Sequence, residues 1–477
     1  MRAEFDADLR ELVARGLLHH DRQTNRYDLH PIVRRYAYDR LGGAEREAAH
    51  GQLRDYFAAV PPPERVQRLE DLAPVIELYH HTVRARQYDE ARTLFRDRIN
   101  RATYYQFGAY QLRIELLRAL FPDGDPSTSS GQAALPRLKD KSAQAWTLNA
   151  LANSYSLSGQ PRRAVPLFEA SNAIDEKRGN KVGVAIGLGA VAKVCYLQLG
   201  ALQAAEANLR RQIALFREIK DESWEAVGHL ELGRLLAYRG VFDEAEQHLA
   251  AAQEVLDEIG PEGTNFVSVV RAYRALRALL MGNVKAALEA ARRALELADE
   301  TAHAAYPFER DYVRAHWLLG AAHRANGDLD EADRHLSEAL TRCRGINAVD
   351  READILLDLA RLRAATGEQD EALRLAQEAL LITERSSYVL QGADVHLFLA
   401  QMALEDGDKE TALEHAGEAR RLATCDGPPD YTYKVAYDEA GALLQRIESG
   451  EADTSVRPGL PTAAEGGSVR RPSPNGS

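Results

Sequence analysis

One spacing recurs along this chain without slipping: a glycine is followed by an alanine five positions later, at seven consecutive places. The pairs are Gly159 and Ala164, Gly200 and Ala205, Gly240 and Ala245, Gly282 and Ala287, Gly327 and Ala332, Gly367 and Ala372, and Gly407 and Ala412. Successive alanines lie 40 to 45 residues apart, so the period is close to forty. Self-similarity at such a period indicates a repeat architecture, in which each unit packs mainly against its neighbours.

The two residue types predict a helical hairpin for every unit. Glycine adopts the left-handed conformation that ends a helix, so we expect a first helix to end at each glycine. The alanine then lies early in a second helix, where a larger side chain would push the two crossing helices apart. Apolar residues at three- and four-residue steps, such as Leu232, Leu235 and Leu236, give each helix a stripe to bury. One hairpin cannot bury both stripes, so the hairpins must stack.

This pattern resembles the tetratricopeptide repeat over roughly residues 143–447. The usual period of that family is about 34, so a period near forty suggests longer helices. The resemblance implies an all-α fold, a right-handed α-solenoid with about seven regular units and degenerate units before them. Tyr155 and Tyr196 stand where the family carries an aromatic residue in the first helix.

The first forty residues have a different organisation. A helix is predicted at 4–16, two short strand-like pieces at 17–21 and 26–30, and a second helix from Ile32. That order is a winged helix, and it resembles the winged-helix end of the STAND or NB-ARC regulatory ATPases. In that family a Met-His-Asp triplet places its histidine near the phosphates of a nucleotide. The triplet here reads Leu29-His30-Pro31, so only His30 carries over, as a nucleotide-sensing residue in the presence of an NTPase domain.

The rest of an ATPase is missing from the sequence. No GxxxxGK[ST] loop is present to cradle a phosphate, so we expect no nucleotide binding by this chain alone and no cofactor. The resemblance therefore implies the C-terminal sensor part of a larger switch, or a partner of a separate NTPase. The predicted organisation is a winged-helix-like module at 1–60, degenerate helical repeats at 61–121, a linker at 122–137, the superhelix at 138–447 and a disordered tail at 448–477.

Composition and charge narrow the classes of partner. The formal net charge is −12, which disfavours nucleic acid because the chain repels phosphate backbones at long range. Three scattered cysteines, Cys195, Cys343 and Cys425, indicate a reducing compartment without disulfides. No signal peptide or apolar stretch long enough for a membrane occurs, so we expect a cytoplasmic protein with no membrane partner.

Standard motifs of catalysis and metal binding do not occur in the sequence. It has no GxSxG, no HExxH and no paired cysteines with metal-ligand spacing, so we expect no enzyme and no metal site. The adjacent histidines at 19–20 and 80–81 are interpreted as solvated or packing residues.

Candidate binding residues follow from the repeat register, because residues five and nine of each first helix face the concave groove in this family. Five side chains in that groove offer polar, cationic or aromatic contacts: Asn149, Asn153, Arg234, Trp317 and Arg361. The two asparagines resemble half of the carboxylate clamp by which some repeats of this family hold a peptide C-terminus. The lysine of that clamp is missing at the register position, although Lys193 lies one residue before Val194. The alternative interpretations are solvated polar groups on a groove wall and a core role for Trp317.

Three functional hypotheses remain open. The favoured one is a non-catalytic module that senses or binds a protein or peptide in the groove and is coupled through the winged helix to a nucleotide-dependent switch. The second is a free-standing scaffold or adaptor with no switch. The third is a transcription regulator that contacts DNA through residues 1–41, where Arg34, Arg35 and Arg40 supply positive charge.

Overall fold

In the computed structural model of the chain, the seven repeat glycines all adopt positive φ angles, from 70° to 87°. Each one ends a helix, and the alanine five residues later is fully buried in the next helix. Arg86, which stands where an eighth glycine is expected, adopts the same left-handed conformation, with φ of 58°. The predicted helix ends are therefore confirmed, because they rest on a local backbone requirement. The structure describes residues 2–21, 26–124, 126, 133–259, 264–300 and 309–449.

The contacts divide the chain into two units, residues 1–99 and 100–477. The described elements of the first unit are α1 (Arg2–Ala14), β1 (Leu18–Asp21), β2 (Arg26–Leu29), α2 (Pro31–Arg40), α3 (Gly43–Ala58), η1 (Leu69–Leu72), α4 (Ala73–Arg84), α5 (Tyr88–Leu94) and the π-helix η2 (Phe95–Ile99). The predicted five-part organisation stays a prediction. Most of its linker and nearly all of its tail lie outside the described residues.

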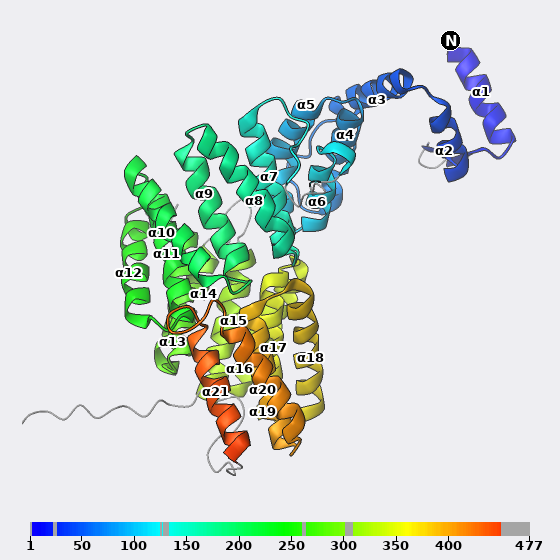
Figure 1. The fold of residues 1–477 in the computed structure, drawn as a ribbon. Helices are drawn as coiled ribbons and strands as arrows, with labels where there is room; N and C mark the ends of the chain where they lie inside the picture. Colours follow the sequence, from blue (N-terminus) through cyan, green and yellow to red (C-terminus); the bar gives the residue numbers. More distant parts are fainter. Residues whose placement is uncertain are drawn as a thin grey trace, which may run out of the picture. The chain divides into compact units, whose positions relative to one another are not determined.

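The second unit holds the repeats. Its described elements are the π-helix η3 (Ala102–Gln106), α6 (Tyr110–Arg118), η4 (Pro122–Gly124), α7 (Lys141–Leu157), α8 (Pro161–Lys177), α9 (Lys181–Val191), the π-helix η5 (Ala192–Tyr196), α10 (Leu202–Ile219), α11 (Glu222–Tyr238), α12 (Phe242–Ile259), α13 (Thr264–Leu280), α14 (Val284–Glu300), α15 (Glu309–Asn326), α16 (Leu329–Gly345), α17 (Val349–Ala365), α18 (Gln369–Ser386), α19 (Val389–Glu405), α20 (Lys409–Ala423) and α21 (Lys434–Ser449). Successive helices pack as antiparallel pairs that stack along the array (Figure 1). The fold is an all-α solenoid.

First and second helices occupy different layers of the second unit. The first helix α11 buries twelve of its residues, distributed all round, whereas the second helix α12 buries four, at steps of three or four residues. A helix that is buried all round lies in the interior, and a helix with one buried stripe lies at the surface. The first helices therefore form an inner layer and the second helices an outer layer.

The superhelix of the second unit closes on itself. The backbone N–H of Val389, at the start of α19, donates to the carbonyl oxygen of Gln198 at 2.7 Å. The rings of Tyr238 and Tyr433 meet edge to face, with centroids 5.4 Å apart. Both pairs join segments that are nearly two hundred residues apart in sequence. One turn of the array thus brings the corners of early hairpins against late ones, which encloses the inner layer.

In the first unit, β1 and β2 form an antiparallel hairpin in which Leu18 pairs with Leu29. The helix–strand–strand–helix order predicted for the start of the chain is thus present, while its assignment as a winged helix stays a prediction. α3 packs on α4, and at that contact the imidazoles of His50 and His81 approach to 3.0 Å between their Nδ1 atoms. No helix of the described residues has the length and apolar character needed to cross a membrane.

Candidate ligand-binding site

Two cavities lie within the closed superhelix. The first, named the asparagine cavity, has a volume of about 270 Å³. Its polar and aromatic lining includes Asn149, Asn153, Lys193, Arg113, Glu231, Gln212, Tyr104, Tyr105, Trp146 and Trp224. The second, named the tryptophan cavity, has a volume of about 280 Å³. Its polar and aromatic lining includes Trp317, Arg324, Asp354, Asp358, Arg361, Asp394, Gln401, Tyr238, Tyr433, Glu439 and Arg446.

The asparagine cavity brings together the groups of the clamp suggested by the sequence. Asn153 donates through Nδ2 to both the side-chain and the backbone oxygen of Asn149, each at 2.9 Å. Lys193 lines the same cavity, although the expected register assigned that position to Val194. The segment that carries Lys193 is the π-helix η5, in which the Leu197 amide donates to the Ala192 carbonyl oxygen. A π turn changes the angle between successive side chains, so an α-helical register fails there.

Electrostatics in the asparagine cavity favour an anionic ligand. Burial lowers the pKa of Lys193, and the nearby Glu231 carboxylate acts in the opposite direction. That carboxylate already forms an ion pair with Arg234, at 2.9 Å. Arg113 adds a second cation in the lining; its Nη1 donates to the carbonyl and side-chain oxygens of Asn100, at 2.9 and 2.8 Å. The lining therefore carries more positive than uncompensated negative charge.

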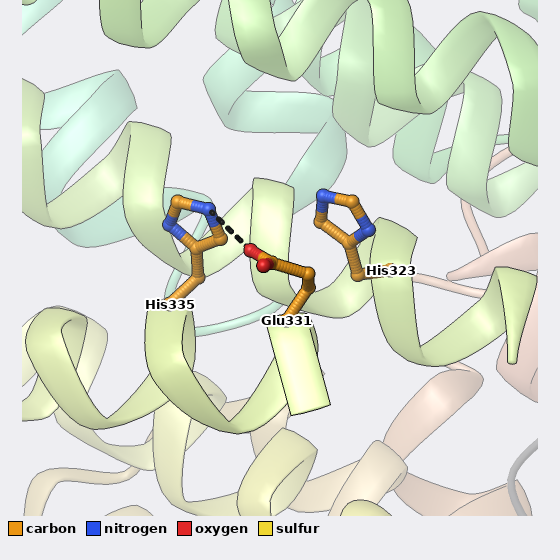
Figure 2. Close-up of side chains that lie close together, drawn as sticks. All are labelled: His323, Glu331 and His335. Atoms are coloured by element: carbon orange, nitrogen blue, oxygen red, sulfur yellow. Dashed lines mark ion pairs between the residues drawn. The ribbon is translucent and has the colours of Figure 1, made fainter. Parts of the chain in front are cut away.

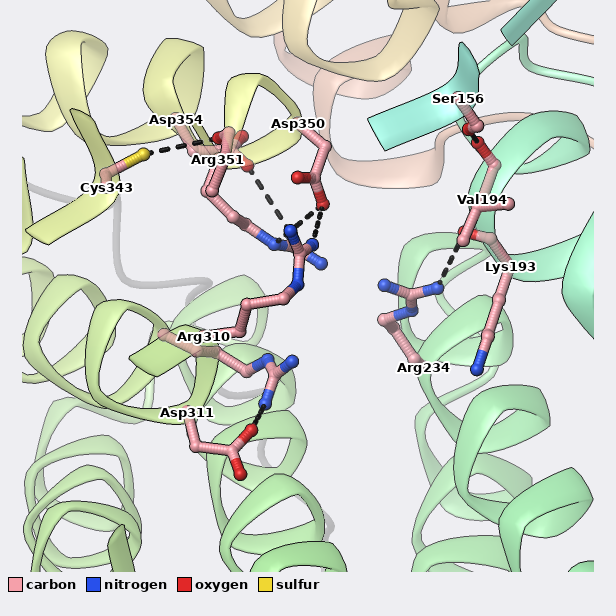
Figure 3. A network of polar contacts seen from close by, with 12 residues as sticks. Ser156, Lys193, Val194, Arg234, Arg310, Asp311, Cys343, Asp350, Arg351 and Asp354 are labelled. Atoms are coloured by element: carbon pink, nitrogen blue, oxygen red, sulfur yellow. Dashed lines mark hydrogen bonds and ion pairs between the residues drawn. The ribbon is translucent and has the colours of Figure 1, made fainter. Parts of the chain in front are cut away.

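Arg234 is buried beside the asparagine cavity and contacts the residues around it. It is 4% exposed, its guanidinium lies 5.0 Å from the ring centroid of Tyr273, and Nη2 donates to the backbone oxygen of Lys193 at 3.1 Å (Figure 3). It belongs to the lining of neither cavity. Its contacts are with Glu231 and with the turn that carries Lys193, and its place in ligand binding stays a prediction.

Ion pairs continue through the inner layer. Arg310 pairs with Asp350 at 2.6 Å, and Arg351 approaches Asp354 to 3.5 Å (Figure 3). Arg314 pairs with Asp311 at 2.9 Å. Buried ion pairs of this kind are costly to desolvate and costly to break, so they constrain the packing of the helices that carry them.

Asp358 organises the tryptophan cavity. Its Oδ2 accepts a hydrogen bond from Nε1 of Trp317 at 2.8 Å, while Oδ1 lies 3.1 Å from Arg324 and 3.4 Å from Arg361. Two other acids of the lining are less well compensated, because burial raises the pKa values of Asp354 and Asp394 to about 7. Tyr433 donates through its hydroxyl to Asp394 Oδ2 at 3.0 Å. This cavity is therefore suited to donors such as backbone amides or a cationic side chain.

The structure separates the predicted site residues into groups. Asn149 and Asn153 line one cavity, and Trp317 and Arg361 line the other. His30 lies in the first unit, where it caps α2 and its Nδ1 accepts from the amide of Ile32 at 3.4 Å.

Sequence reasoning did not include Asp354 or Asp394 among the site residues and left Lys193 outside the register. The acidic positions of α17 and α19 were the available signal, because a helix that is apolar on most faces rarely carries an aspartate without a partner or a ligand.

Comparison with known proteins supports the repeat assignment. Residues 311–385 match the family model described as tetratricopeptide repeat. No curated protein matches the chain. Among solved structures, a Rap protein complexed with Competence and Sporulation Factor is 14% identical, with a TM-score of 0.50, over 74% of this chain and 97% of that one.

Two further structures match with lower similarity. Aspartyl phosphate phosphatase F from Bacillus subtilis is 12% identical, with a TM-score of 0.40, over 84% of this chain and 98% of that one. A STAND protein with a tetratricopeptide repeat sensor from Pyrococcus horikoshii is 15% identical, with a TM-score of 0.39, over 93% of this chain and 59% of that one. Taken with the glycine-ended hairpins and their buried alanines, the comparisons show that the second unit is a helical solenoid, in which residues 311–385 match the tetratricopeptide repeat.

Proposed function

We propose that this chain is a non-catalytic binding module that holds a protein or peptide ligand inside the closed superhelix, through a carboxylate in the asparagine cavity. The observation that carries the proposal is the meeting of Asn149, Asn153 and Lys193 in one lining. Two amides and an ammonium are hydrogen-bond donors suited to a carboxylate, and charge-assisted bonds of this kind are stronger than those between neutral groups.

The aromatic residues beside these donors support a peptide as the ligand. Trp146, Trp224 and Tyr105 line the same cavity and provide large, rigid contact surfaces. Binding hot spots in protein interfaces are enriched in tryptophan, tyrosine and arginine, enclosed by groups that exclude water. The cavity volume of about 270 Å³ suits a terminal carboxylate with one or two side chains. The structurally similar Rap protein, which was crystallised with Competence and Sporulation Factor, is an example of this fold in complex with a partner.

The finer proposal is that the module is the sensor part of a STAND-type signalling switch, with an NTPase domain, upstream or separate, as its partner. Its support is the resemblance of residues 1–41 to the winged-helix end of that family, with His30 at the phosphate-facing position. Calorimetry with Mg-ATP should detect no binding by the chain alone. Micromolar affinity would contradict the assignment, because it would require a nucleotide site within this chain.

A free-standing adaptor and a DNA-binding regulator remain the alternatives. Arg34 and Arg35, on the exposed α2, favour the second of these. Fluorescence anisotropy with a random-sequence DNA duplex separates them, because a DNA-binding module should bind it with a strong dependence on salt concentration.

The experiment that tests the proposed function uses an array of random synthetic peptides with free C-termini, probed with the full chain. We expect binders whose affinity falls at least tenfold when the same peptides carry a C-terminal amide, because amidation removes the carboxylate. Equal binding of free and amidated peptides, or no binder at all, would contradict the proposal.

A further inference from the structure

Histidines form a pattern of their own on the repeat hairpins. Three pairs join a first helix to its second helix, with the same separation of 19 residues: His229 with His248, His316 with His335, and His396 with His415. Their Nδ1 atoms lie 2.6, 2.9 and 2.9 Å apart. The first pair has a glutamate beside each histidine, Glu225 and Glu244. The middle pair differs because a third histidine, His323, lies beside it and forms a close group with Glu331 and His335.

The arrangement of these side chains follows from the hairpin. Glu331 and His335 are four residues apart in the first turns of α16, so they share one face of that helix. His323 lies in the last turn of α15, across the corner made by Gly327. Ligand atoms of His323, Glu331 and His335 all lie within 4.8 Å of one another. Figure 2 shows the Glu331 carboxylate between the two imidazole rings.

Hydrogen-bond chemistry assigns lone pairs to the ring nitrogens that face this carboxylate. Nε2 of His335 lies 2.9 Å from Nη2 of Arg334, and a guanidinium is only a donor, so this Nε2 must be an acceptor. The Nδ1 of His335 then donates to His316. Nδ1 of His323 lies 3.1 Å from Oδ2 of Asp328, and a carboxylate accepts, so Nε2 of His323 carries its lone pair.

Each histidine therefore has the outer partner that metal-bound histidines require. A ligating imidazole almost always donates its other N–H to a carboxylate, carbonyl or similar acceptor, which fixes the ring and the tautomer. Asp328 supplies that acceptor for His323, and His316 supplies it for His335. The side chains of His323 and His335 are 13% and 5% exposed, whereas Glu331 is 51% exposed and free to adjust. Two imidazoles and a carboxylate are a ligand set suited to zinc.

We propose that His323, Glu331 and His335 form a Zn²⁺ site at the corner between α15 and α16, with the fourth coordination position left to water. Arg334 is the internal competitor for that site, because Nη2 lies 2.5 Å from Glu331 and 2.9 Å from His335. Its side chain is 63% exposed, so it can swing outward when a metal enters. Tetrahedral zinc with bonds near 2.1 Å needs ligand atoms about 3.4 Å apart, so the side chains must close by up to about 1.4 Å from the 4.8 Å within which they lie.

The test is calorimetric titration of the full chain, without an affinity tag, with Zn²⁺, and visible absorption of bound Co²⁺ as a second readout. We expect one tight site per chain. Glu331→Gln and His323→Ala should each weaken it at least tenfold. Glu331 is exposed and His323 lies in the last turn of α15, so the fold should persist in both variants. Arg334→Gln should tighten it about threefold or more, because the competing cation is gone.

The matched control is Glu371→Gln, at the equivalent position of the next hairpin. Glu371 is paired with Arg374, as Glu331 is with Arg334, but Leu375 and Arg363 occupy the positions of the two histidines. This variant should bind Zn²⁺ as the parent does. Absence of binding would overturn the proposal, and so would a site unaffected by Glu331→Gln and His323→Ala. A site lost only when His229 or His396 is replaced would assign zinc to another histidine pair and overturn it as well.

Discussion

Replacing Lys193 by methionine should weaken ligand binding without a loss of stability. The change removes the ammonium from the asparagine cavity and keeps most of the side-chain volume. A hydrogen bond to a charged group contributes about 1.5–3 kcal/mol, so a carboxylate ligand should bind roughly 10- to 150-fold more weakly.

The same substitution should leave the stability of the fold nearly unchanged or raise it. Burial lowers the pKa of Lys193 below its usual value, which means that folding disfavours the charged form. A buried cation of this kind lowers the stability of the native state at neutral pH. Removing it does not leave Glu231 unpaired, because Glu231 keeps its ion pair with Arg234. The free energy of unfolding of Lys193→Met should therefore stay within about 1 kcal/mol of the parent or rise.

Binding is measured by the fluorescence anisotropy of a labelled peptide selected on the peptide array, and stability by urea denaturation of the parent and of Lys193→Met. Lys285→Met, which removes the same charge from an exposed position on α14, is the control and should change neither quantity. Unchanged affinity in Lys193→Met would refute the carboxylate site. A large loss of stability would refute the view that this lysine is retained for binding.

Three further changes test the fold and its buried charges. Burial raises the pKa of Asp354 to about 7, so the native state binds this proton more tightly than the unfolded chain. The contribution of Asp354 to stability must therefore fall as pH rises from about 4 to about 7. In urea melts at several pH values, Asp354→Asn should gain stability relative to the parent across this window, by up to about 1.4 kcal/mol per pKa unit. Ala245→Leu should cost about 1–3 kcal/mol in the same melts, because Ala245 is fully buried where helices cross. Gly327→Ala should lower the free energy of unfolding by about 1–2 kcal/mol, since φ is +87° and only backbone strain opposes the methyl group. Its control, Gly417→Ala, lies inside α20 where the methyl group is equally uncrowded, and should raise that free energy by about 0.5–1 kcal/mol. Equal effects of the two substitutions would contradict the assignment of Gly327 to a helix corner.

The hairpins were predictable because their determinants are local. A glycine at Gly240 has to supply a positive φ, and an alanine at Ala245 has to fit a helix crossing, and both requirements are visible in a short stretch of sequence. Not every corner shows this signal. Lys220 and Ser387, which end second helices, adopt left-handed conformations without being glycine, at φ of 59° and 57°.

The closure of the superhelix could not be read from the sequence. It depends on pairs such as Tyr238 with Tyr433, whose proximity follows from the summed rotation of several hairpins and not from any local pattern. The burial of Arg234 could not be read for the same reason: an open groove would expose this side chain, and the closed inner layer buries it.

Two site features were missed because their sequence signals are irregular. Lys193 lies on a π turn, where counting by α-helical register assigns the cavity position to Val194. The histidine cluster is split across a helix corner, so His323 stands eight residues before Glu331 and matches no standard metal-binding spacing.

Ligand binding inside the closed superhelix can be measured by hydrogen–deuterium exchange of the full chain, with and without a peptide selected on the peptide array. New protection is expected in the inner elements α7, η5 and α11, which carry Asn149, Asn153, Lys193 and Glu231. Protection confined to the outer helices α8, α10 and α12 would contradict it.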